Sequence, residues 1–419
     1  MSQQPSRAAK PNRRSFLRGA AAGVAGGSLL SLAGCGGCGG KDDPNLLRVV
    51  SSLPRTGSAQ GQTDTIVNGI KLALEEAAGS VGSLKFDFQD KDDATAQANG
   101  WDGAVEAANA RGAAADANVM VFIGPYNSGA AKQSIPILND AGLVQISPAC
   151  TAIELTKPVE GDTSGAPGIY RQKGVTFCRV CPNDILQGTA SAQFVFEELK
   201  ARKVYVLDDT EVYGRGIANM FEKKARDLGM NVLGHEGIVT TQNDFVQLMT
   251  KIRAMNPDAV YFGGTTQSKG GQVVKDMKGV GLNVSIVVPD GCYENAFIES
   301  VGAQNLANVY ATMGGFDPSK LEGAGAEFVR KYREKYGKMP EAYAIYGYEA
   351  AKVFTEAVKK VGKKDRQAIR EAVLATKDFT AGALGKWSFD ADGDTTLEVL
   401  TISKIENGNF IPVKTVTKK

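Results

Sequence analysis

Short apolar runs alternate with amphipathic segments along most of this chain. Within residues 119–151, an apolar run at 119–123 stops at a Gly-Pro pair, and an amphipathic segment runs from Gly129 to Gly142. A second apolar run occupies 143–147. Short apolar runs bounded by Gly and Pro predict buried strands, and apolar positions at helical spacing predict an amphipathic helix. This stretch is therefore predicted to be strand, loop, helix, strand and loop.

The same alternation recurs on both sides of this stretch. Further strands are predicted at 46–53, 84–89, 175–180, 203–208, 232–239, 258–262, 285–288, 309–313, 387–389 and 397–405. Helices are predicted at 63–78, 95–111, 184–200, 214–228, 245–255, 267–280, 324–336, 343–361 and 364–375, with an acidic loop at 90–93. Two series of alternating strands and helices predict an α/β protein with two doubly wound, mostly parallel sheets.

Two of the predicted loops carry hydroxyl side chains where such sheets bind ligands. Ser128 follows the strand 119–123, and Thr151 follows the strand 143–147. Open α/β sheets bind ligands beyond the carboxyl ends of their strands, and the helix at Ser128 offers free N–H groups and a positive dipole end. The pair therefore predicts a cradle for a carboxylate. The alternative is that Ser128 is only an N-cap and Thr151 only a turn residue.

Residues 1–34 are predicted to be an export leader. Arg13 and Arg14 form a twin-arginine pattern before a weakly apolar region, and the residues up to Cys35 resemble a bacterial lipobox. The apolar region is about half of the ~20 residues that a spanning helix needs, so a retained transmembrane helix is not expected. Resemblance to lipoprotein leaders implies cleavage before Cys35, a lipid on its sulfur and a tether over 35–45. The alternative is a cysteine that follows small residues by chance.

The leader also accounts for the apparent basicity of the chain. The net charge is +2, but residues 1–34 hold basic side chains and no acid, so the remaining chain is slightly acidic. Nothing in this balance indicates nucleic-acid binding. The content of 43% hydrophobic and 22% charged residues is ordinary for a soluble globular protein, and 419 residues suffice for two domains with cores of their own.

The cysteines do not predict a metal site. Cys178 and Cys181 have a CxxC spacing, but no second pair accompanies them and His235 is the sole histidine. Residues three apart on a strand point to opposite faces, so a bridge between these two would need a turn. We expect the cysteines other than Cys35 to be mostly unpaired, buried thiols, although an exported protein can form disulfides.

Catalytic and cofactor motifs are also missing from the sequence. The stretch 263–266 follows a strand but lacks the lysine spacing of a phosphate-binding loop. His235 is interpreted as a surface residue rather than a general base, and the acids of 90–93 as solvated rather than calcium ligands. The expectation is a binding protein that uses no cofactor and no metal.

An ordered set of motifs carries a family resemblance from residue 46 to the end of the chain. The motifs are SSLPRTGSAQGQ, NGIKLALEE, FIGPYNSGAA, ISPACTAIELT, DDTEVYGRG, VYFGGTT, VPDG, EAYAIYGYEAA and LGKWSFDADGD. Together they resemble the extracytoplasmic substrate-binding proteins of ABC transporters for branched-chain amino acids and related small amides. The resemblance implies a type I periplasmic-binding-protein fold, with two lobes joined by three crossovers and the ligand between them.

The resemblance also implies an organisation and a set of partners. Lobe one would comprise 46–182 with 314–381, and lobe two 183–313 with 382–419. The protein would be an exported, lipid-anchored monomer on the outer face of a bacterial membrane. It would close on its ligand and present a surface to permease and ATPase subunits.

The resemblance assigns roles to individual positions in the cleft. Ser128, Thr151 and the backbone at Ala149 match positions that hold the ligand's carboxylate. Asp290 matches the acid that faces the α-ammonium, and Tyr213 matches an aromatic residue of lobe two that closes over the ligand. The other matched positions are an acid near the first crossover and two walls of the side-chain pocket, namely Asp184, Tyr126 and Tyr343.

Some of these positions also have purely structural interpretations, and some depart from the family pattern. Tyr213 could be a packing residue at a helix start, Tyr343 a core residue and Asp184 an N-cap. Thr265 stands where many amino-acid binders have tyrosine, and Asp290 is one methylene shorter than the usual glutamate. These departures are compatible with a small amphoteric ligand, but they leave the identity of that ligand open.

Three functions compete. The first is capture of a small amino acid, most readily of the branched-chain type, for delivery to an ABC importer. The second keeps the fold for a binding or sensor protein that recognises an amide, urea or aromatic acid. The third, an exported hydrolase, lacks a nucleophile–base pair.

Overall fold

The computed structural model describes residues 43–77, 80–159, 167–242 and 244–417. The predicted leader with Arg13 and Arg14, and the part of the predicted tether that holds Cys35 and Cys38, lie outside the described residues. Within the described ranges, no helix combines the length and apolar character needed to cross a membrane.

The first of two large sheets is built from the N-terminal part of the chain. Its strand order is β2-β3-β1-β6-β7-β8, and every pairing except β2 with β3 is parallel. The strands are β1 (Leu46–Leu53), β2 (Ser80–Val81), β3 (Leu84–Asp92), β6 (Val119–Ile123), β7 (Gln145–Ser147) and β8 (Phe177–Arg179). The central strand β6 is buried at every position, as expected for a parallel strand covered on both faces.

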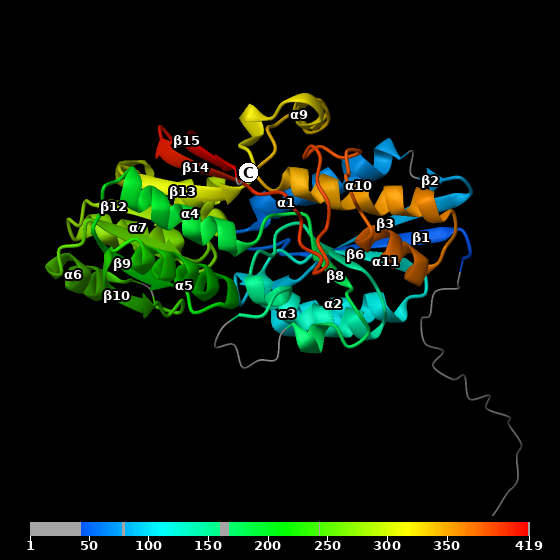
Figure 1. The fold of residues 1–419 in the computed structure, drawn as a ribbon, viewed down its shortest axis with the longest axis horizontal. Coiled ribbons are helices and arrows are strands. Elements are labelled where there is room, and N and C mark those ends of the chain that lie inside the picture. Colours follow the sequence, from blue (N-terminus) through cyan, green and yellow to red (C-terminus); the bar gives the residue numbers. More distant parts are fainter. Residues whose placement is uncertain (1–42, 78–79, 160–166, 243, 418–419) are drawn as a thin grey trace, which may run out of the picture. The chain divides into compact units, whose positions relative to one another are not determined.

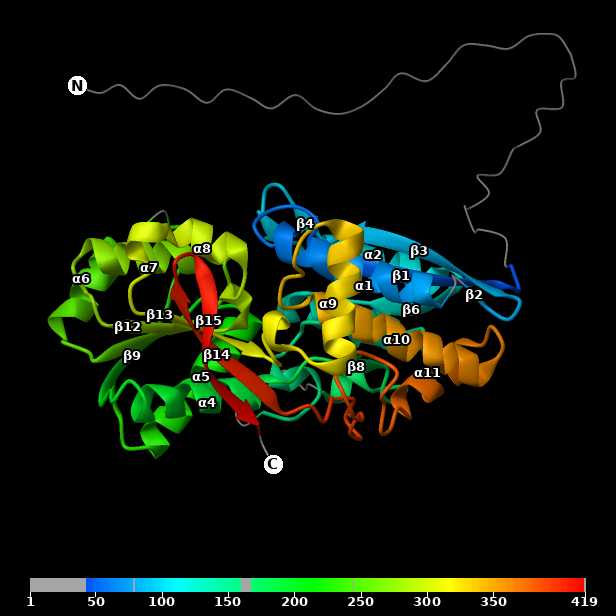
Figure 2. The same ribbon diagram turned by 90° about the horizontal axis from the view of Figure 1, so that it is seen from above.

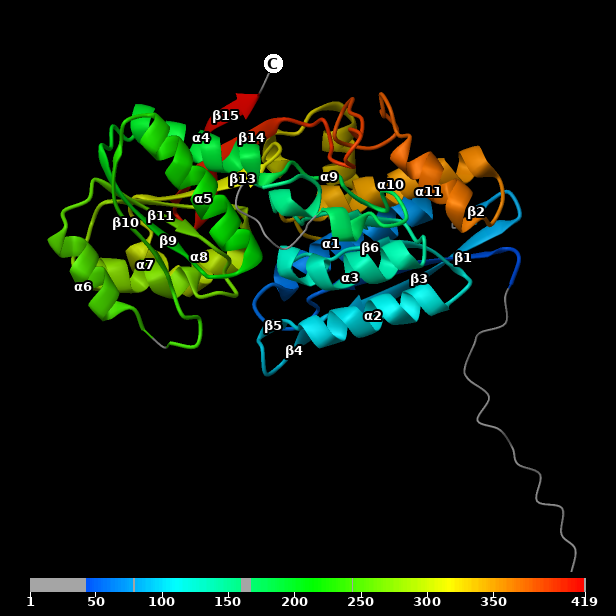
Figure 3. The ribbon, with the colours of Figure 1, turned by 60° about the horizontal axis from the view of Figure 1, so that its bottom comes forward.

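Helices from distant parts of the chain cover this sheet and complete lobe one. On one face α1 (Gln60–Glu76) packs against α10 (Ala344–Val361), which contacts α11 (Arg366–Leu374). On the other face α2 (Gly103–Ala115) and α3 (Ser128–Asp140) lie side by side (Figure 3). The chain thus returns to lobe one before the last two strands of the second sheet are formed, with α9 (Gly323–Tyr336) as the first helix on the way back (Figure 1).

The second sheet forms the centre of lobe two. Its order is β10-β9-β11-β12-β13-β14-β15, parallel up to β13 and antiparallel from there. The strands are β9 (Lys203–Asp208), β10 (Asn231–Gly237), β11 (Ala259–Gly263), β12 (Ser285–Val288), β13 (Val309–Gly314), β14 (Val399–Glu406) and β15 (Asn409–Thr417). Figure 2 shows α4 (Asp184–Glu197) and α5 (Val212–Asp227) on one face, and α6 (Val246–Ala254), α7 (Gly270–Gly279) and α8 (Asn295–Val301) on the other. The predicted α/β architecture of two doubly wound, mostly parallel lobes is confirmed.

The predicted helix 95–111 was wrong at its start. Its first part is a small antiparallel hairpin, β4 (Ala94–Thr95) with β5 (Gly100–Trp101), and α2 begins only at Gly103. Asn99 turns the hairpin with φ of 50°, a conformation that asparagine tolerates. Asp102 caps α2 by accepting hydrogen bonds from the amides of Ala104 (2.8 Å) and Val105 (3.1 Å). The alanine-rich composition concealed this turn.

The acidic loop predicted at 90–93 was also wrong. Strand β3 continues to Asp92 and pairs with β1 over its whole length. The Asp90 carboxylate accepts from the Ser51 hydroxyl at 2.9 Å and from Arg55 at 3.0 Å, and Asp93 is fully buried. The solvated interpretation was therefore wrong for Asp93, whereas Asp90 is exposed and Asp92 only partly buried.

Two differences between the predicted and the observed elements lie at the end of the chain, and a third concerns a short helix of lobe two. The strand predicted at 387–389 consists of isolated bridges from Trp387 to Phe379 and from Phe389 to Thr395. Strand β15 was not predicted, because it is an edge strand with every second residue exposed and carries a proline. The helix α8 was missed because it has only 7 residues.

A buried ion pair links two of the passages between the lobes. Arg179 at the end of β8 is fully buried, and its Nε donates to Asp394 Oδ1 at 2.7 Å. Asp394 also accepts from the Asn183 side chain at 2.9 Å, just before α4. Burial opposes the charge of Asp394, but Arg179 and Lys157 beside it hold the pKa of that carboxyl below its ordinary value. The lobe boundaries at 182/183, 313/314 and 381/382 stay a prediction, and just past the third of them Ala383 and Trp387 still donate to Glu349 of α10 in lobe one.

We expect Asp394→Ala to destabilise the protein by about 3–5 kcal/mol, because it leaves the Arg179 charge buried without its partner. Urea denaturation would measure this loss. Asp227→Ala is the matched control, since Asp227 forms an ion pair with Lys223 in which both side chains are more than half exposed. The control should cost less than about 1 kcal/mol. Equal losses in both variants would contradict a special role for the buried pair.

Candidate functional site

A small inner cavity lies where the carboxyl ends of both sheets meet. Its volume is about 20 Å³, room for roughly one water. Lobe one contributes residues from the loops after β6 and β7 and from the start of α10, and lobe two contributes residues after β11 and β12 and from α5. The lining residues are Tyr126, Asn127, Ser128, Ala149, Tyr343, Tyr213, Thr265, Asp290 and Gly291. The structure thus brings seven of the nine predicted ligand-binding positions together.

Ser128 reaches the cavity through a tight connection from β6 to α3. Gly124 has φ of 146°, and a Cβ there would lie 2.3 Å from the Ser52 carbonyl oxygen, so only glycine fits. The helix begins at Ser128, with Asn127 rather than Ser128 in the N-cap position, so the N-cap interpretation was wrong. The Ser128 hydroxyl accepts from the Ala152 amide at 3.3 Å. The first-turn amides of α3, which lack partners within a helix, therefore begin at the cavity wall.

The loop after β7 places Ala149 in the wall and Thr151 behind it. The Ser147 hydroxyl accepts from the amides of Ala149 (3.2 Å) and Cys150 (2.8 Å), which fixes the turn. Thr151 is buried, does not line the cavity, and accepts with its carbonyl from the Asp184 amide at 3.0 Å. Its hydroxyl therefore does not share the cavity wall with that of Ser128.

Asp184 also lies behind the cavity wall. It is the first residue of α4, whose N-cap is Asn183, so the N-cap interpretation of Asp184 was wrong. Burial, reinforced by the nearby charge of Asp290, raises the pKa of Asp184 to about 8. Asp184 is therefore a second buried acid beneath the cavity.

Asp290 is the charged centre of the inner cavity. Its carboxylate accepts hydrogen bonds from the Gln187 side chain at 2.8 Å and from the hydroxyls of Tyr213 and Tyr343. The Gln187 amide is oriented in turn, since its oxygen accepts from the Asp290 backbone at 3.0 Å and from Thr312 at 2.8 Å. Burial raises the pKa of Asp290 to about 6, although these donors oppose the shift. Among the described residues, the hydrogen-bond donors to this carboxyl group are all uncharged.

Tyr126, Tyr213 and Tyr343 are buried, and they also line the cavity. Tyr213 and Tyr343 hold Asp290 from lobe two and lobe one respectively, so their proposed packing roles do not exclude contact with the cavity. Tyr343 also packs edge-on against Tyr126, with ring centroids 6.1 Å apart. Its backbone amide donates to Gln62 at 3.2 Å. An aromatic wall therefore surrounds the carboxylate.

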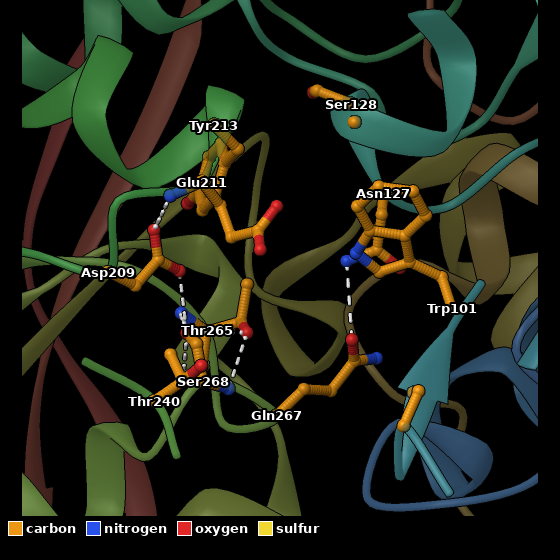
Figure 4. Close-up of a pocket in the computed structure, with 13 residues that line it drawn as sticks. Trp101, Asn127, Ser128, Asp209, Glu211, Tyr213, Thr240, Thr265, Gln267 and Ser268 are labelled. Carbon is orange, nitrogen blue, oxygen red and sulfur yellow. Dashed lines mark hydrogen bonds between the residues drawn. The ribbon is translucent and has the colours of Figure 1, made fainter. Parts of the chain in front are cut away.

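An outer chamber of about 200 Å³ continues from the inner cavity toward solvent (Figure 4). Asn127, Ser128, Tyr213 and Thr265 line both spaces. Thr265 is tied to Ser268, its amide donating to the Ser268 hydroxyl at 2.8 Å. The chamber also includes residues that the sequence analysis missed, namely Trp101, Asp209, Glu211, Gln267 and Ser268.

A sequence signal existed for some of these missed residues. Asp209 and Glu211 directly follow β9, so the rule that singled out Ser128 could have found them too. Asp209 is buried and accepts from the Ser268 hydroxyl at 2.6 Å and from the Glu211 amide at 3.0 Å. Burial raises its pKa to about 7. Trp101 had no such signal, because its strand was predicted to be helical.

His235 and the four cysteines of the described ranges are not among the lining residues of either cavity. The surface interpretation of His235 was wrong, since its ring is mostly buried between Asp208 (3.0 Å) and Glu222 (2.6 Å). Burial lowers the pKa of His235, but these two carboxylates raise it above its ordinary value overall. The expectation of buried, unpaired thiols is confirmed for Cys150, Cys178, Cys181 and Cys292.

Two α/β lobes with a cavity lined from both sides define a two-lobed solute-binding protein. A family model described as "Periplasmic binding protein" matches residues 47–409. The Leu/Ile/Val-binding protein homolog 1 of Brucella abortus is 30% identical over 358 residues, which is 85% of this chain and 89% of that protein.

Two solved structures of binding proteins share this fold. A leucine-binding protein from Thermotoga maritima has a TM-score of 0.77 at 25% identity and covers 89% of this chain and 99% of its own. A solute-binding protein of an ABC transporter from R. palustris, in complex with benzoate, has a TM-score of 0.74 at 17% identity over 89% and 96% of the two chains. The chain belongs to the periplasmic binding protein family, whose members are extracytoplasmic solute-binding proteins rather than enzymes.

The raised pKa of Asp290 predicts a pH dependence of the unliganded protein. The folded-state pKa of about 6 exceeds the ordinary 3.8, so folding favours the protonated form. The resulting stability is complete below about pH 4 and is lost as the pH rises through 6, by about 3 kcal/mol. The free energy of unfolding of Asp290→Asn minus that of the parent should therefore be larger at pH 8 than at pH 4. Urea denaturation at both pH values measures this, and parallel pH profiles would contradict it.

Proposed function

We propose that this protein captures a small amino acid between its lobes and delivers it to an ABC importer. The observation that carries the proposal is the pairing of opposite electrostatic features in one cavity. Asp290 of lobe two supplies a buried carboxylate, and α3 in lobe one brings its N-terminal, first-turn amides to the cavity at Ser128. A zwitterion matches both ends, since helix N-termini bind carboxylates and a buried carboxylate favours an ammonium group.

The Asp290 carboxylate supports an ammonium ligand more than a neutral one. Its three donors are an amide and two phenol hydroxyls, all uncharged near neutral pH, so the negative charge has no cationic partner among them. An ammonium group would supply that partner within a site that excludes most water. An acid such as benzoate would instead place a second negative charge beside Asp290, which is unfavourable at this burial.

The carboxylate end of the ligand is assigned to lobe one. The first-turn amides of α3 and the Ser128 hydroxyl are the proposed donors, with the Ala149 backbone beside them. Thr151 and Asp184 are proposed to support this arrangement from behind the wall, and Tyr126, Tyr213, Thr265 and Tyr343 to enclose the ligand. Branched-chain amino acids are the first ligands to test, since relatives are named for them.

We expect Asp290→Asn to weaken the binding of L-leucine by about 2–5 kcal/mol, because the ligand's ammonium group loses its charged partner. Ser128→Ala should cost only about 0.5–1.5 kcal/mol, since the α3 amides remain. Isothermal titration of the mature protein gives both numbers. Asp276→Asn is the matched control, because Asp276 is a buried aspartate of lobe two that contacts Phe245 and Gln272 outside the cavity.

Two outcomes would contradict the assignment. One is an Asp290→Asn protein that binds leucine as tightly as the Asp276→Asn control. The other is a thermal-shift screen in which amides or aromatic acids stabilise the protein and zwitterions do not. Either result would favour the amide, urea or aromatic-acid alternative on the same fold.

The anchored, exported state is the remaining part of the proposal. Changing Arg13 and Arg14 to lysine should block translocation, because the leader matches a twin-arginine signal. Cys35→Ala should release the exported protein from membranes, since it removes the proposed site of lipidation. Cell fractionation with salt-washed membranes measures both. A Cys35→Ala protein that stays with the membranes would contradict the lipid anchor.

A further inference from the structure

The outer chamber is more polar than an aliphatic ligand requires. Side chains from both lobes face one another across it, with Trp101 and Asn127 on one side and Glu211, Gln267 and Thr240 on the other (Figure 4). A space of about 200 Å³ is large enough for several waters that could solvate these groups. A purely apolar side chain that displaced those waters would leave the polar groups without partners.

Two amides in the wall have unused hydrogen-bonding capacity. The Asn127 side chain donates to Gln267 Oε1 at 3.3 Å and so connects the two lobes across the chamber. The remaining atoms of this pair, Asn127 Oδ1 and Gln267 Nε2, are buried and lack hydrogen-bond partners among the described residues. Buried polar atoms are normally satisfied, so this pair indicates an additional polar group in the chamber when it is occupied.

The carboxyl groups of the wall are not balanced by basic side chains. Asp209 and Glu211 are lining residues, and no lysine or arginine lines this chamber within the described chain. The Asp209 carboxylate already accepts hydrogen bonds from the Ser268 hydroxyl and from the Glu211 amide. The Glu211 side chain forms no ion pair within 4.0 Å among the described residues, although it also lines a neighbouring cavity together with Arg215, one turn further along α5, whose charge acts on it. The Glu211 carboxylate is therefore available to a hydrogen-bond donor.

Trp101 gives the chamber a flat apolar wall. Its ring lies against the first turn of α3, where a Cβ on Gly129 would come within 2.5 Å of the ring. The absence of a side chain at Gly129 thus lets the indole lie beside the start of the helix. A flat group such as an amide or guanidinium can stack on an indole while its N–H groups reach a carboxylate.

We infer that the outer chamber is a second subsite, which holds the donor end of a long ligand side chain against Glu211. The inference rests on the proposed function, because the inner cavity must first hold the ligand's ammonium and carboxylate. It extends the ligand range beyond aliphatic amino acids to those with amide or guanidinium side chains. Glu211 and Trp101 are then residues that determine specificity, and side chains ending in a carboxylate are rejected by like charge.

Isothermal titration with a matched ligand panel tests this subsite. L-arginine and L-glutamine should bind competitively with L-leucine, and L-glutamate should bind at least about tenfold more weakly than L-glutamine. Glu211→Gln should weaken arginine about tenfold or more and change leucine less than about threefold, because leucine does not reach the carboxylate. Glu299→Gln, at an exposed glutamate of lobe two outside the chamber, is the control.

The outcomes separate the subsite from the function on which it rests. If leucine binds but arginine and glutamine do not, the subsite is overturned and the amino-acid assignment stands. Equal weakening of all ligands by Glu211→Gln would also overturn it, since a structural role does not discriminate between side chains. If no amino acid binds, the proposed function fails and the subsite fails with it.

Discussion

The buried carboxylate of Asp290 is the constraint on which the ligand cavity depends. A carboxylate without a cation is costly inside a protein, so its charge must be met by oriented hydrogen-bond donors. Two of these, Gln187 and Tyr213, come from lobe two, and the third is Tyr343 of lobe one. The contact between the lobes is thus part of the solvation of this charge. Any ligand that binds there must supply an equivalent donor, and an ammonium group does so with the appropriate charge.

Recognition divides between two adjoining spaces with different chemistry. The inner cavity offers one anionic group and one helix N-terminus, which suit the ends common to all α-amino acids. The outer chamber offers a carboxylate, two amides and an indole, which we propose to discriminate between side chains. Asn127 contributes to both spaces, and its hydrogen bond to Gln267 joins the lobes at their border. Class recognition and side-chain selection are therefore assigned to separate residues.

The passages between the lobes restrict how these two spaces can be assembled. Arg179 donates to Asp394 and to the carbonyl oxygens of Cys150 (2.9 Å) and Ala152 (2.7 Å). Those carbonyls belong to the loop after β7, in which Ala149 lines the cavity. The same guanidinium thus holds a cavity loop and a crossover together, at full burial. An ion pair of this kind favours one arrangement of the passages more than it adds net stability.

The sequence by itself determined the alternation of elements, and with it the fold class and the loops that carry ligand positions. Strands such as β6 and β12 were predictable because a fully buried parallel strand is a short, continuous apolar run. Ser128 and Thr151 were identified because loops after such strands meet at one edge of a sheet, whereas Asp290 was identified only through the family resemblance. Only the tertiary structure decided that Trp101 faces the cleft, that Thr151 lies behind its wall, and that Tyr343 reaches Asp290. These contacts join residues far apart in the chain, and local periodicity says which face of an element is apolar but not which distant side chain it meets.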